Sequence, residues 1–208
     1  MSFLRYPRQS IKVNKKKDGA TPFKFATLVS SRLNVDLLVE LPEGEDLNEW
    51  LAINTYDFFT HVKVLYGTLS HSCTDVTCPV MSAANWDYLW ADGVKIKKPI
   101  KVTAPQYCTY LFEWIQGMIE SESKFPTRDD AEFSSSFRKK VVLPSFKRLS
   151  RVYAHMYYSH KDRMRELGLI ECLDTSFAHF MAFVNRYELI TAKKDLAPLT
   201  PLLEASES

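Results

Sequence analysis

The chain has 208 residues, of which 46% are hydrophobic and 25% charged, and its formal net charge is only +2. This composition predicts a single globular domain with a sizeable core and excludes a disordered or fibrous protein. No apolar run approaches the ~18 residues that a membrane-spanning helix needs, and the N-terminal residues lack the apolar core of a signal peptide. We therefore expect a protein of a reducing compartment, in which the four cysteines are free thiols or metal ligands.

Charge is distributed in blocks along the chain. Residues 5–24 hold seven Lys and Arg with one acid, residues 33–62 hold seven acids without Lys or Arg, and residues 133–161 hold seven Lys and Arg without an acid. Such blocks indicate separate patches for separate partners, or else surfaces that neutralise one another in the folded protein. Charge alone leaves both interpretations open.

The N-terminal part has prolines, a glycine and a lysine triplet but little apolar periodicity. We expect a basic, partly mobile arm over residues 1–32, a folded domain over residues 33–203 and a disordered tail over residues 204–208. Phosphorylation of Ser10 or Thr27 in the arm would recruit it to a basic surface. The alternative is an ordinary frayed terminus.

The longest helical pattern runs from residue 41 to residue 69, and acids mark its start, where negative charge suits the helix dipole. One stripe of this helix is apolar and predicts contact with the core: Leu47, Leu51, Phe58, Val62 and Leu65. Another arc is acidic, with two large apolar residues in or beside it: Glu45, Asp46, Glu49, Trp50, Ile53 and Asp57. This arc predicts a docking surface for a basic, amphipathic partner, unless Trp50 simply packs under a neighbouring loop.

Gly67 is expected to end this helix, and a loop with Cys73 and Cys78 follows. Asp92-Gly93, between an aromatic run and an alternating apolar run, predicts a β-hairpin. Residues 106–120 form an aromatic-rich pattern typical of a buried helix, and Asp174 or Thr175 can cap a last helix. The predicted fold class is mostly α, a helical bundle with one small β-hairpin.

The segment from Ser145 to His160 predicts an amphipathic helix, with Pro144 marking its start or a kink. Its aromatic and aliphatic residues fill one side, whereas three cations, Lys147, Arg148 and Arg151, gather on the other side. Arginine forks hold phosphate oxygens, so the cluster predicts binding of a phosphorylated protein segment. A nucleic-acid surface is the rival, but it would need a more basic chain and exposed stacking aromatics.

Two pairs of potential metal ligands lie far apart in the sequence, Cys73 with Cys78 and His155 with His160. Two thiolates and two imidazoles suit a closed tetrahedral Zn²⁺ site of structural type, since no coordination position stays open. Residues five apart on a helix diverge by ~140°, so we expect the helix to end or bend before His160. The alternative is two half-buried cysteines and two core histidines.

The sequence lacks the motifs of the common enzyme classes. It has no glycine-rich phosphate loop, no GxSxG and no HExxH, and only six glycines in all. Cys108 or Cys172 with His179 could form a nucleophile pair, yet Cys108 lies in a strongly apolar segment, which favours an inert thiol. We therefore expect a protein that is not an enzyme.

Several stretches between Leu41 and Leu203 resemble the Mob/phocein family of kinase co-activators. They are LPEGEDLNEWLAINTYDFF, LYGT, the Cys73/Cys78 loop with CPVMSA, WADG, IKKPI, KRLSRVYAHMYYSH, TSFAHF and LAPL. The chain looks most similar to the branch that activates NDR/LATS-type AGC kinases in Hippo and mitotic-exit signalling. Residues 1–40 align poorly.

The resemblance implies a helical-bundle domain with zinc at Cys73, Cys78, His155 and His160. It implies that Lys147, Arg148 and Arg151 bind a phosphothreonine motif of an upstream sterile-20-type kinase or scaffold. It also implies that the positions contacting the basic N-terminal regulatory region of the downstream kinase are Glu45, Glu49, Trp50 and Asp57.

The family likeness further implies that Thr27, and Ser10 as a second site, are phosphorylated. A cytoplasmic location is expected, with the nucleus, the spindle poles and the division site as further places. An alternative function is a phocein-like scaffold in phosphatase or vesicle-trafficking complexes without kinase activation. A nucleic-acid binder is the weakest alternative, and we expect no nucleic-acid partner.

Overall fold

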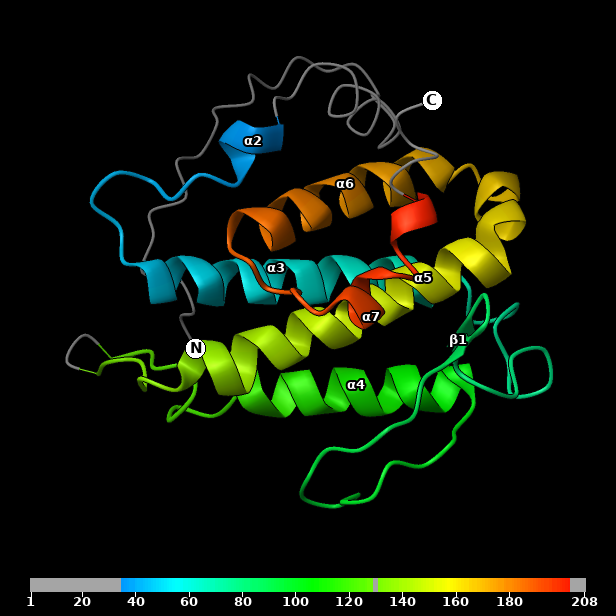
Figure 1. Cartoon of the computed structure of the whole chain (residues 1–208), viewed down its shortest axis with the longest axis horizontal. Helices are drawn as coiled ribbons and strands as arrows, with labels where there is room; N and C mark the ends of the chain where they lie inside the picture. The colour runs from blue at the N-terminus through cyan, green and yellow to red at the C-terminus, as the bar shows by residue number, and fades with distance from the viewer. Residues whose placement is uncertain (1–34, 129–130, 203–208) are drawn as a thin grey trace, which may run out of the picture.

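The computed structural model describes residues 35–128 and 131–202, and it confirms the mostly helical fold (Figure 1). The elements in chain order are α2 (Val35–Leu38), α3 (Leu47–Gly67), β1 (Ser82–Ala83), β2 (Trp86–Asp87), α4 (Ala104–Ile119), the π-helical turn η1 (Arg138–Val142), α5 (Leu143–Glu166), α6 (Ile170–Arg186) and α7 (Lys193–Leu196). Ser10, Thr27 and the expected boundaries after residues 32 and 203 lie outside the described residues. Among the helices described, none is both long and apolar enough to cross a membrane.

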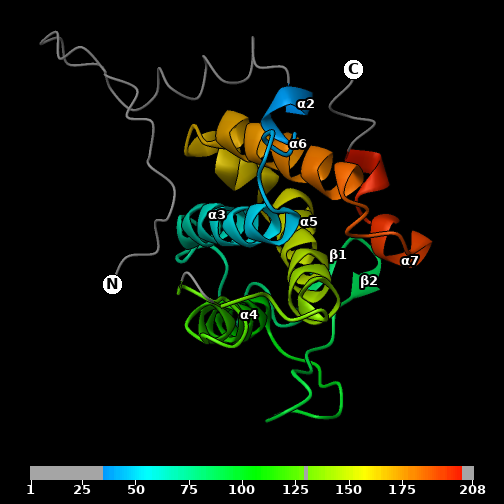
Figure 2. The same ribbon diagram turned by 90° about the vertical axis from the view of Figure 1, so that its left-hand side faces the viewer.

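Helix α5 is the central element of the bundle. It contacts α3, α4, α6, η1 and the strand β1. Figure 2, which looks along the bundle, shows α5 between α6 and α4, with the hairpin on its flank. Each long helix therefore buries one face against α5, and the outer faces remain available for solvent or partners.

The core between α3, α5 and α6 is a cluster of phenylalanines. Phe146 of α5 stacks on Phe180 and Phe183 of α6, with ring centroids 5.3 and 5.5 Å apart. Phe58 of α3 meets Phe146 edge-on at 5.6 Å, and all four rings are essentially inaccessible to solvent. These contacts fix how the three helices pack.

Helix α3 has nearly the extent that the sequence predicts. Asp46 is the N-cap: its Oδ1 accepts hydrogen bonds from the backbone N–H of Asn48 (2.8 Å) and Glu49 (3.1 Å). The expected core positions Leu51, Phe58, Val62 and Leu65 are buried. The placement of Leu47 in this stripe is wrong, because this residue of the first turn is 37% exposed.

The start of α5 agrees with the sequence, whereas the start of α6 does not. Pro144 lies in the first turn of α5, directly after the π-helical turn η1. The predicted cap at Asp174 or Thr175 is wrong, because α6 already begins at Ile170. Gly168, at φ 68°, reverses the chain directly after α5, so the helix can start earlier. Asp174 instead accepts a hydrogen bond from the Tyr157 hydroxyl at 2.7 Å.

The expected small hairpin is present but lies at another place. Ser82 pairs with Asp87 and Ala83 with Trp86, around a turn in which Ala84 adopts φ 48°. Asp92-Gly93 forms a separate turn, closed by hydrogen bonds from the Val94 and Ile96 N–H groups to the Asp92 carboxylate. Only a single bridge, Trp90 with Ile100, flanks that turn within the described chain.

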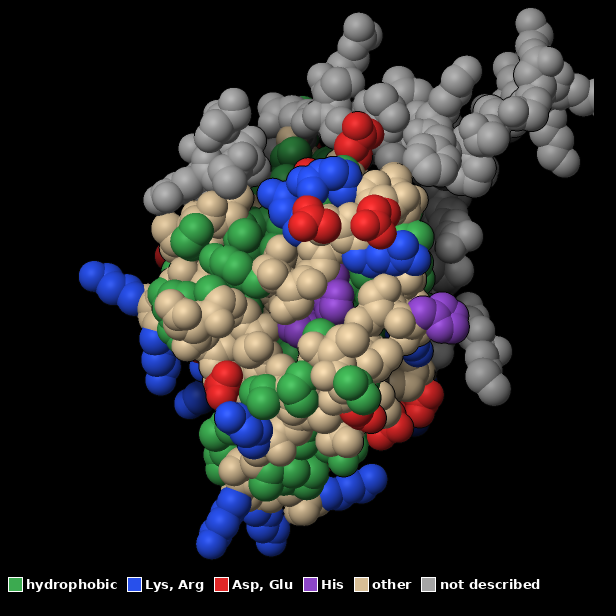
Figure 3. Space-filling view, turned by 90° about the vertical axis from the view of Figure 1, so that its right-hand side faces the viewer, with side chains coloured by type: hydrophobic (Ala, Val, Ile, Leu, Met, Phe, Trp, Pro, Cys, Tyr) green, Lys and Arg blue, Asp and Glu red, His purple; other side chains and the backbone are tan. Residues whose placement is uncertain are grey.

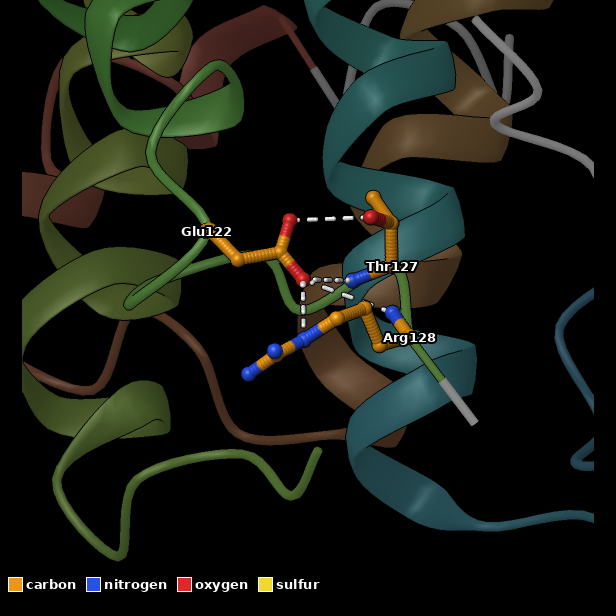
Figure 4. Close-up of polar contacts among 3 residues, drawn as sticks. All are labelled: Glu122, Thr127 and Arg128. Atoms are coloured by element: carbon orange, nitrogen blue, oxygen red, sulfur yellow. Dashed lines mark hydrogen bonds and ion pairs between the residues drawn. The ribbon is translucent and has the colours of Figure 1, made fainter. Parts of the chain in front are cut away.

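The loop after α4 is closed by one acidic side chain. The Glu122 carboxylate accepts hydrogen bonds from the Thr127 N–H and hydroxyl, both at 2.8 Å, and from the Arg128 N–H at 3.3 Å (Figure 4). The bonds from Thr127 lower the pKa of Glu122, so the carboxylate stays charged and holds the loop. This loop leads the chain from α4 towards η1.

Candidate functional site

The four predicted metal ligands converge in the structure. Cys73 and Cys78, from the loop between α3 and β1, face His155 and His160 of α5, and the ligand atoms all lie within 4.8 Å of one another. All four side chains are buried. The face of the molecule in Figure 3 has histidine side chains at the floor of a hollow, and a cleft of ≈ 330 Å³ is lined by His155, His160 and Cys78.

The expected break of the helix between the two histidines is wrong. Helix α5 continues from Leu143 to Glu166 without interruption. The two imidazole rings still meet, with centroids 5.1 Å apart and planes at 72°, because both long side chains lean towards the cysteine loop. The two side chains do leave the helix in directions ~140° apart, but the imidazole side chains are long enough to meet despite this angle.

Distances within the cluster fit a tetrahedral ion. Zn–S bonds of about 2.3 Å and Zn–N bonds of about 2.0 Å at tetrahedral angles place S and N about 3.5 Å apart. Cys73 Sγ lies 3.4 Å from His155 Nε2, and Cys78 Sγ lies 3.4 Å from His160 Nε2. The donor set and its spacing can therefore hold a metal ion.

A second layer of contacts orients these ligands. His155 Nδ1 lies 2.8 Å from the Ser82 carbonyl oxygen, so its N–H donates there and Nε2 offers its lone pair to the cluster. The Tyr66 hydroxyl lies 3.2 Å from Cys73 Sγ. Burial raises the pKa of Cys73 to about 12, and burial together with the neighbouring His155 lowers the pKa of His160 to about 4. Metal binding must therefore displace the proton of the Cys73 thiol, whereas the two imidazoles are held in their neutral form by burial.

The three predicted phosphate-binding cations lie on one side of α5, away from the phenylalanine core. Lys147 Nζ is 2.7 Å from Asp195 Oδ2 of α7. Arg151 donates from Nη1 to the Tyr107 hydroxyl at 3.0 Å, and its guanidinium lies 5.1 Å from the Tyr88 ring centroid. The structure therefore places the trio together, but with partners that the sequence did not indicate.

Arg148 is the most deeply placed of the three. Its guanidinium stacks on Trp114 at 4.1 Å and lies 5.1 Å from Trp90, and its Nη2 donates to the Ala91 carbonyl at 2.8 Å. Its Nη1 is buried, and no atom of the described chain accepts a hydrogen bond from it. Burial lowers the pKa of Arg148, which is the electrostatic cost of holding this cation out of water.

The rings of Tyr88, Trp90, Tyr107 and Trp114 form an aromatic platform beneath the two arginines, which was not predicted. The run WDYLW was visible, but it was assigned to a hairpin rather than to arginine-binding rings. Asp195 was also missed, because nothing in the sequence indicates that α7 returns to α5. Both features depend on contacts between segments far apart in the sequence: Arg148 meets Trp90 and Trp114, and Lys147 meets Asp195.

The predicted kinase-binding positions all lie on or directly before α3. Asp57 is exposed, and Glu45 and Glu49 are half-buried. Trp50 is also half-buried, and its ring lies 6.4 Å from Phe183 of α6, so part of this residue packs between the two helices. Tyr56, on the same helix, is 47% exposed and adds apolar surface to this region.

Fold and site together define a small helical protein in which a Cys₂His₂ cluster that could hold a metal ion joins a loop to a central, cation-bearing helix. Comparison with known proteins gives the family: the sequence profile of the Mob1/phocein family matches residues 26–199. The chain belongs to this family.

Individual relatives agree with this assignment. "MOB kinase activator-like 1 homolog B" of Dictyostelium discoideum is 45% identical over 95% of this chain and 90% of the relative. "MOB kinase activator-like 1A" of Arabidopsis thaliana is 50% identical over 86% of this chain and 82% of the relative. A protein of the same name from Medicago sativa subsp. falcata is 48% identical over 86% of this chain and 82% of the relative.

Proposed function

We propose that this protein is a non-enzymatic adaptor that co-activates a protein kinase of the NDR/LATS type within the AGC class. The names of the similar proteins, MOB kinase activators, support a kinase as the partner. A non-enzymatic role agrees with the environment of Cys108, one of the two cysteines weighed as a nucleophile from the sequence. Burial raises the pKa of Cys108, so the reactive thiolate is disfavoured there.

The cation cluster binds phosphothreonine on an upstream sterile-20-type kinase or scaffold. The observation that carries this proposal is the gathering of Lys147, Arg148 and Arg151 on one side of α5, where the Lys147 and Arg151 side chains are partly exposed. A phosphate can accept hydrogen bonds from Lys147 and Arg151, and the positive charge of Arg148 behind them adds to the attraction. Arg148 Nη1 is itself covered by the chain, so this atom is not a direct phosphate contact in the present conformation.

The test is phosphopeptide binding by fluorescence anisotropy. Replacing Lys147 and Arg151 with Ala should weaken binding of a phosphothreonine peptide at least tenfold and leave unphosphorylated peptide binding unchanged. Arg163→Ala with Arg165→Ala is the matched control, because these exposed arginines lie on the same helix and pair with neighbouring acids. Equal binding by the two double variants would remove the assignment.

The acidic side of α3 binds the basic N-terminal regulatory region of the kinase through Glu45, Glu49, Trp50 and Asp57. Charge complementarity and the adjacent exposed Tyr56 support this surface. Glu49→Lys with Asp57→Lys should abolish capture of the purified kinase extension. Glu113→Lys, on the exposed side of α4, should not. Retained capture by the α3 variant would contradict the proposal.

The metal ion is Zn²⁺ in a structural role, held by Cys73, Cys78, His155 and His160. The closed Cys₂His₂ donor set and the 3.4 Å spacings support zinc. When bound, it joins the cysteine loop to α5. Elemental analysis of purified protein should give one zinc per chain, and chelation should lower the melting temperature.

We also propose that phosphorylation of Thr27, and of Ser10 as a second site, adjusts the kinase contact, and that the protein acts in the cytoplasm, the nucleus and at the spindle poles or division site. Capture from native lysate with and without phosphatase treatment tests the partner set. Recovery of phosphatase or trafficking complexes without a kinase would favour the scaffold function instead.

A further inference from the structure

The connection between β2 and α4 carries a loop that extends away from the helical bundle, past α4 (Figures 1 and 2). We name residues 91–101 the lysine loop. An antiparallel bridge closes its base, and Ile96 packs against the core. At its turn the Asp92 carboxylate accepts hydrogen bonds from the N–H groups of Val94 and Ile96, at 2.7 and 2.9 Å. The loop therefore keeps a defined shape although it projects from the bundle.

Four lysines with exposed side chains lie in this loop: Lys95, Lys97, Lys98 and Lys101. Lys101 pairs with Asp87 at 2.8 Å, and within the described chain Lys97 and Lys98 take part in no ion pair. Counting Asp87 and Asp92 against the four lysines leaves two positive charges in excess, as many as the whole chain has. The lysine loop is therefore a local concentration of positive charge in a nearly neutral protein.

Aliphatic side chains accompany these lysines. Val94 is 76% exposed, and Leu89 and Ile100 at the base of the loop are exposed as well. In Figure 3 the lower end of the molecule, where Figure 1 places this loop, shows hydrophobic atoms flanked by Lys and Arg side chains. Residues 91–101 hold no aromatic ring on which a nucleic-acid base could stack. Lysines around exposed aliphatic groups fit a surface that is both anionic and apolar, which is the character of an anionic membrane.

We propose that the lysine loop docks this protein on an anionic lipid surface. Val94 enters the boundary between the headgroups and the acyl chains, while Lys97 and Lys98 contact the anionic headgroups. A loop with few cations and one exposed valine gives weak, reversible binding, so it concentrates the protein at a membrane without anchoring it there. This surface is separate from the proposed kinase and phosphothreonine contacts and does not depend on them.

The position of the loop is compatible with simultaneous binding of the kinase. In both ribbon views the lysine loop lies beyond α4, on the side away from α3 (Figures 1 and 2). A membrane that meets the loop therefore leaves the acidic side of α3 clear. The negative charge of that side is also kept away from the anionic headgroups, which would repel it.

The test is co-sedimentation of the full chain with vesicles of phosphatidylcholine alone or mixed with phosphatidylserine. Wild type should bind the mixed vesicles, more weakly as salt is raised, and the neutral vesicles hardly at all. Lys97→Gln with Lys98→Gln should weaken partitioning onto the mixed vesicles about 30-fold, since each lysine near an anionic leaflet contributes about fivefold. Lys139→Gln with Lys140→Gln is the matched control, because this adjacent exposed pair on η1 is followed by two buried valines. It makes the same change in net charge without an exposed aliphatic neighbour.

Substitutions of Val94 test whether the loop enters the lipid. Val94→Ser should weaken binding to the mixed vesicles about fivefold, because the inserted aliphatic surface is lost. In Val94→Trp, lipids brominated in their acyl chains should quench the emission of the added indole. Val64, on α3, is 64% exposed and offers the control at a similarly exposed valine: Val64→Ser should not weaken binding, and Val64→Trp should not be quenched beyond wild type. Circular dichroism of each variant confirms that it is folded.

Equal losses in the two lysine-pair variants would overturn the inference, because the binding would then follow net charge rather than the loop. The absence of quenching in Val94→Trp would overturn it too, as would wild-type protein that binds mixed-sequence DNA more tightly than the mixed vesicles and leaves them for it. None of these measurements involves a kinase or a phosphopeptide. Failure of the inference therefore leaves the proposed function as it stands, and failure of the phosphothreonine site leaves the inference as it stands.

Discussion

Replacing Tyr66 with Phe removes one hydroxyl beside the metal cluster and leaves the ring in place. The hydroxyl oxygen lies 3.2 Å from Cys73 Sγ, and the ring lies 6.0 Å from Phe112, a packing contact that Phe retains. Burial, reinforced by the nearby Cys108 sulfur, raises the pKa of Tyr66, so the hydroxyl keeps its proton. It is therefore a donor to the Cys73 thiolate of the metal-bound state.

The expected loss of zinc affinity follows from the charge of the acceptor, the Cys73 thiolate. A hydrogen bond to a charged group contributes about 1.5–3 kcal/mol. Tyr66→Phe should therefore weaken zinc binding by about 10- to 150-fold, which overlaps the range found for residues that orient metal ligands. Without metal the Cys73 thiol is neutral, because burial raises its pKa to about 12, so the stability of the metal-free protein should change much less.

The assay is competition for zinc between the protein and a chromogenic chelator of known affinity. Tyr56→Phe is the control, because it makes the same substitution on the same helix at a residue that is 47% exposed. Zinc affinity within twofold of wild type in Tyr66→Phe would refute the reasoning. So would an equal loss of stability with and without metal, since that would indicate lost packing rather than a lost donor.

Three further predictions concern the fold. Phe146→Ala should lower the free energy of unfolding by about 3–5 kcal/mol in urea titrations followed by circular dichroism, because its ring is fully buried among Phe58, Phe180 and Phe183; a loss under 1 kcal/mol would contradict the packing. Asp46→Ala should cost about 1 kcal/mol by removing the N-cap of α3, and Asp46→Asn much less. In metal-free protein the pKa of His160 is about 4 when folded and about 6.5 when unfolded, so the unfolded chain binds more protons between these values. Stability should be full above pH 6.5 and fall by about 2–3 kcal/mol towards pH 4, and His160→Gln should flatten that part of the profile.

Periodicity and local chemistry were enough to predict the long helices and the four residues of the cysteine–histidine cluster. Helix α3 ends at Gly67 as expected, and the predicted helix over residues 106–120 is α4 with an earlier start. A helix depends on the periodicity of neighbouring residues, and Cys and His pairs at such spacings are typical of metal sites. The cysteine and histidine pairs are therefore visible before the fold is known.

Features that depend on how distant segments meet were not predictable in the same way. The start of α6 depends on the reversal at Gly168, and the position of the hairpin depends on its contact with α5. The platform beneath Arg148 and the pairing of Lys147 with Asp195 need the folded chain. The expected break of α5 before His160 was wrong for another reason, because the length of the imidazole side chains lets both histidines reach the cysteines from a continuous helix.

Because α5 is continuous, an insertion or deletion between Arg151 and His155 would change how its cations and its histidines are oriented relative to each other. Arg151 and His155 are one turn apart on a helix that carries both the cations and the histidines. One residue inserted between them would rotate the two groups relative to each other by ~100° and shift them by ~1.5 Å. With the histidines held opposite the cysteine loop, the cations would then point into the bundle or away from the aromatic platform. The cysteine–histidine cluster thus fixes the rotation of α5 about its own axis, and a change in residue count between Arg151 and His155 would separate the two sites.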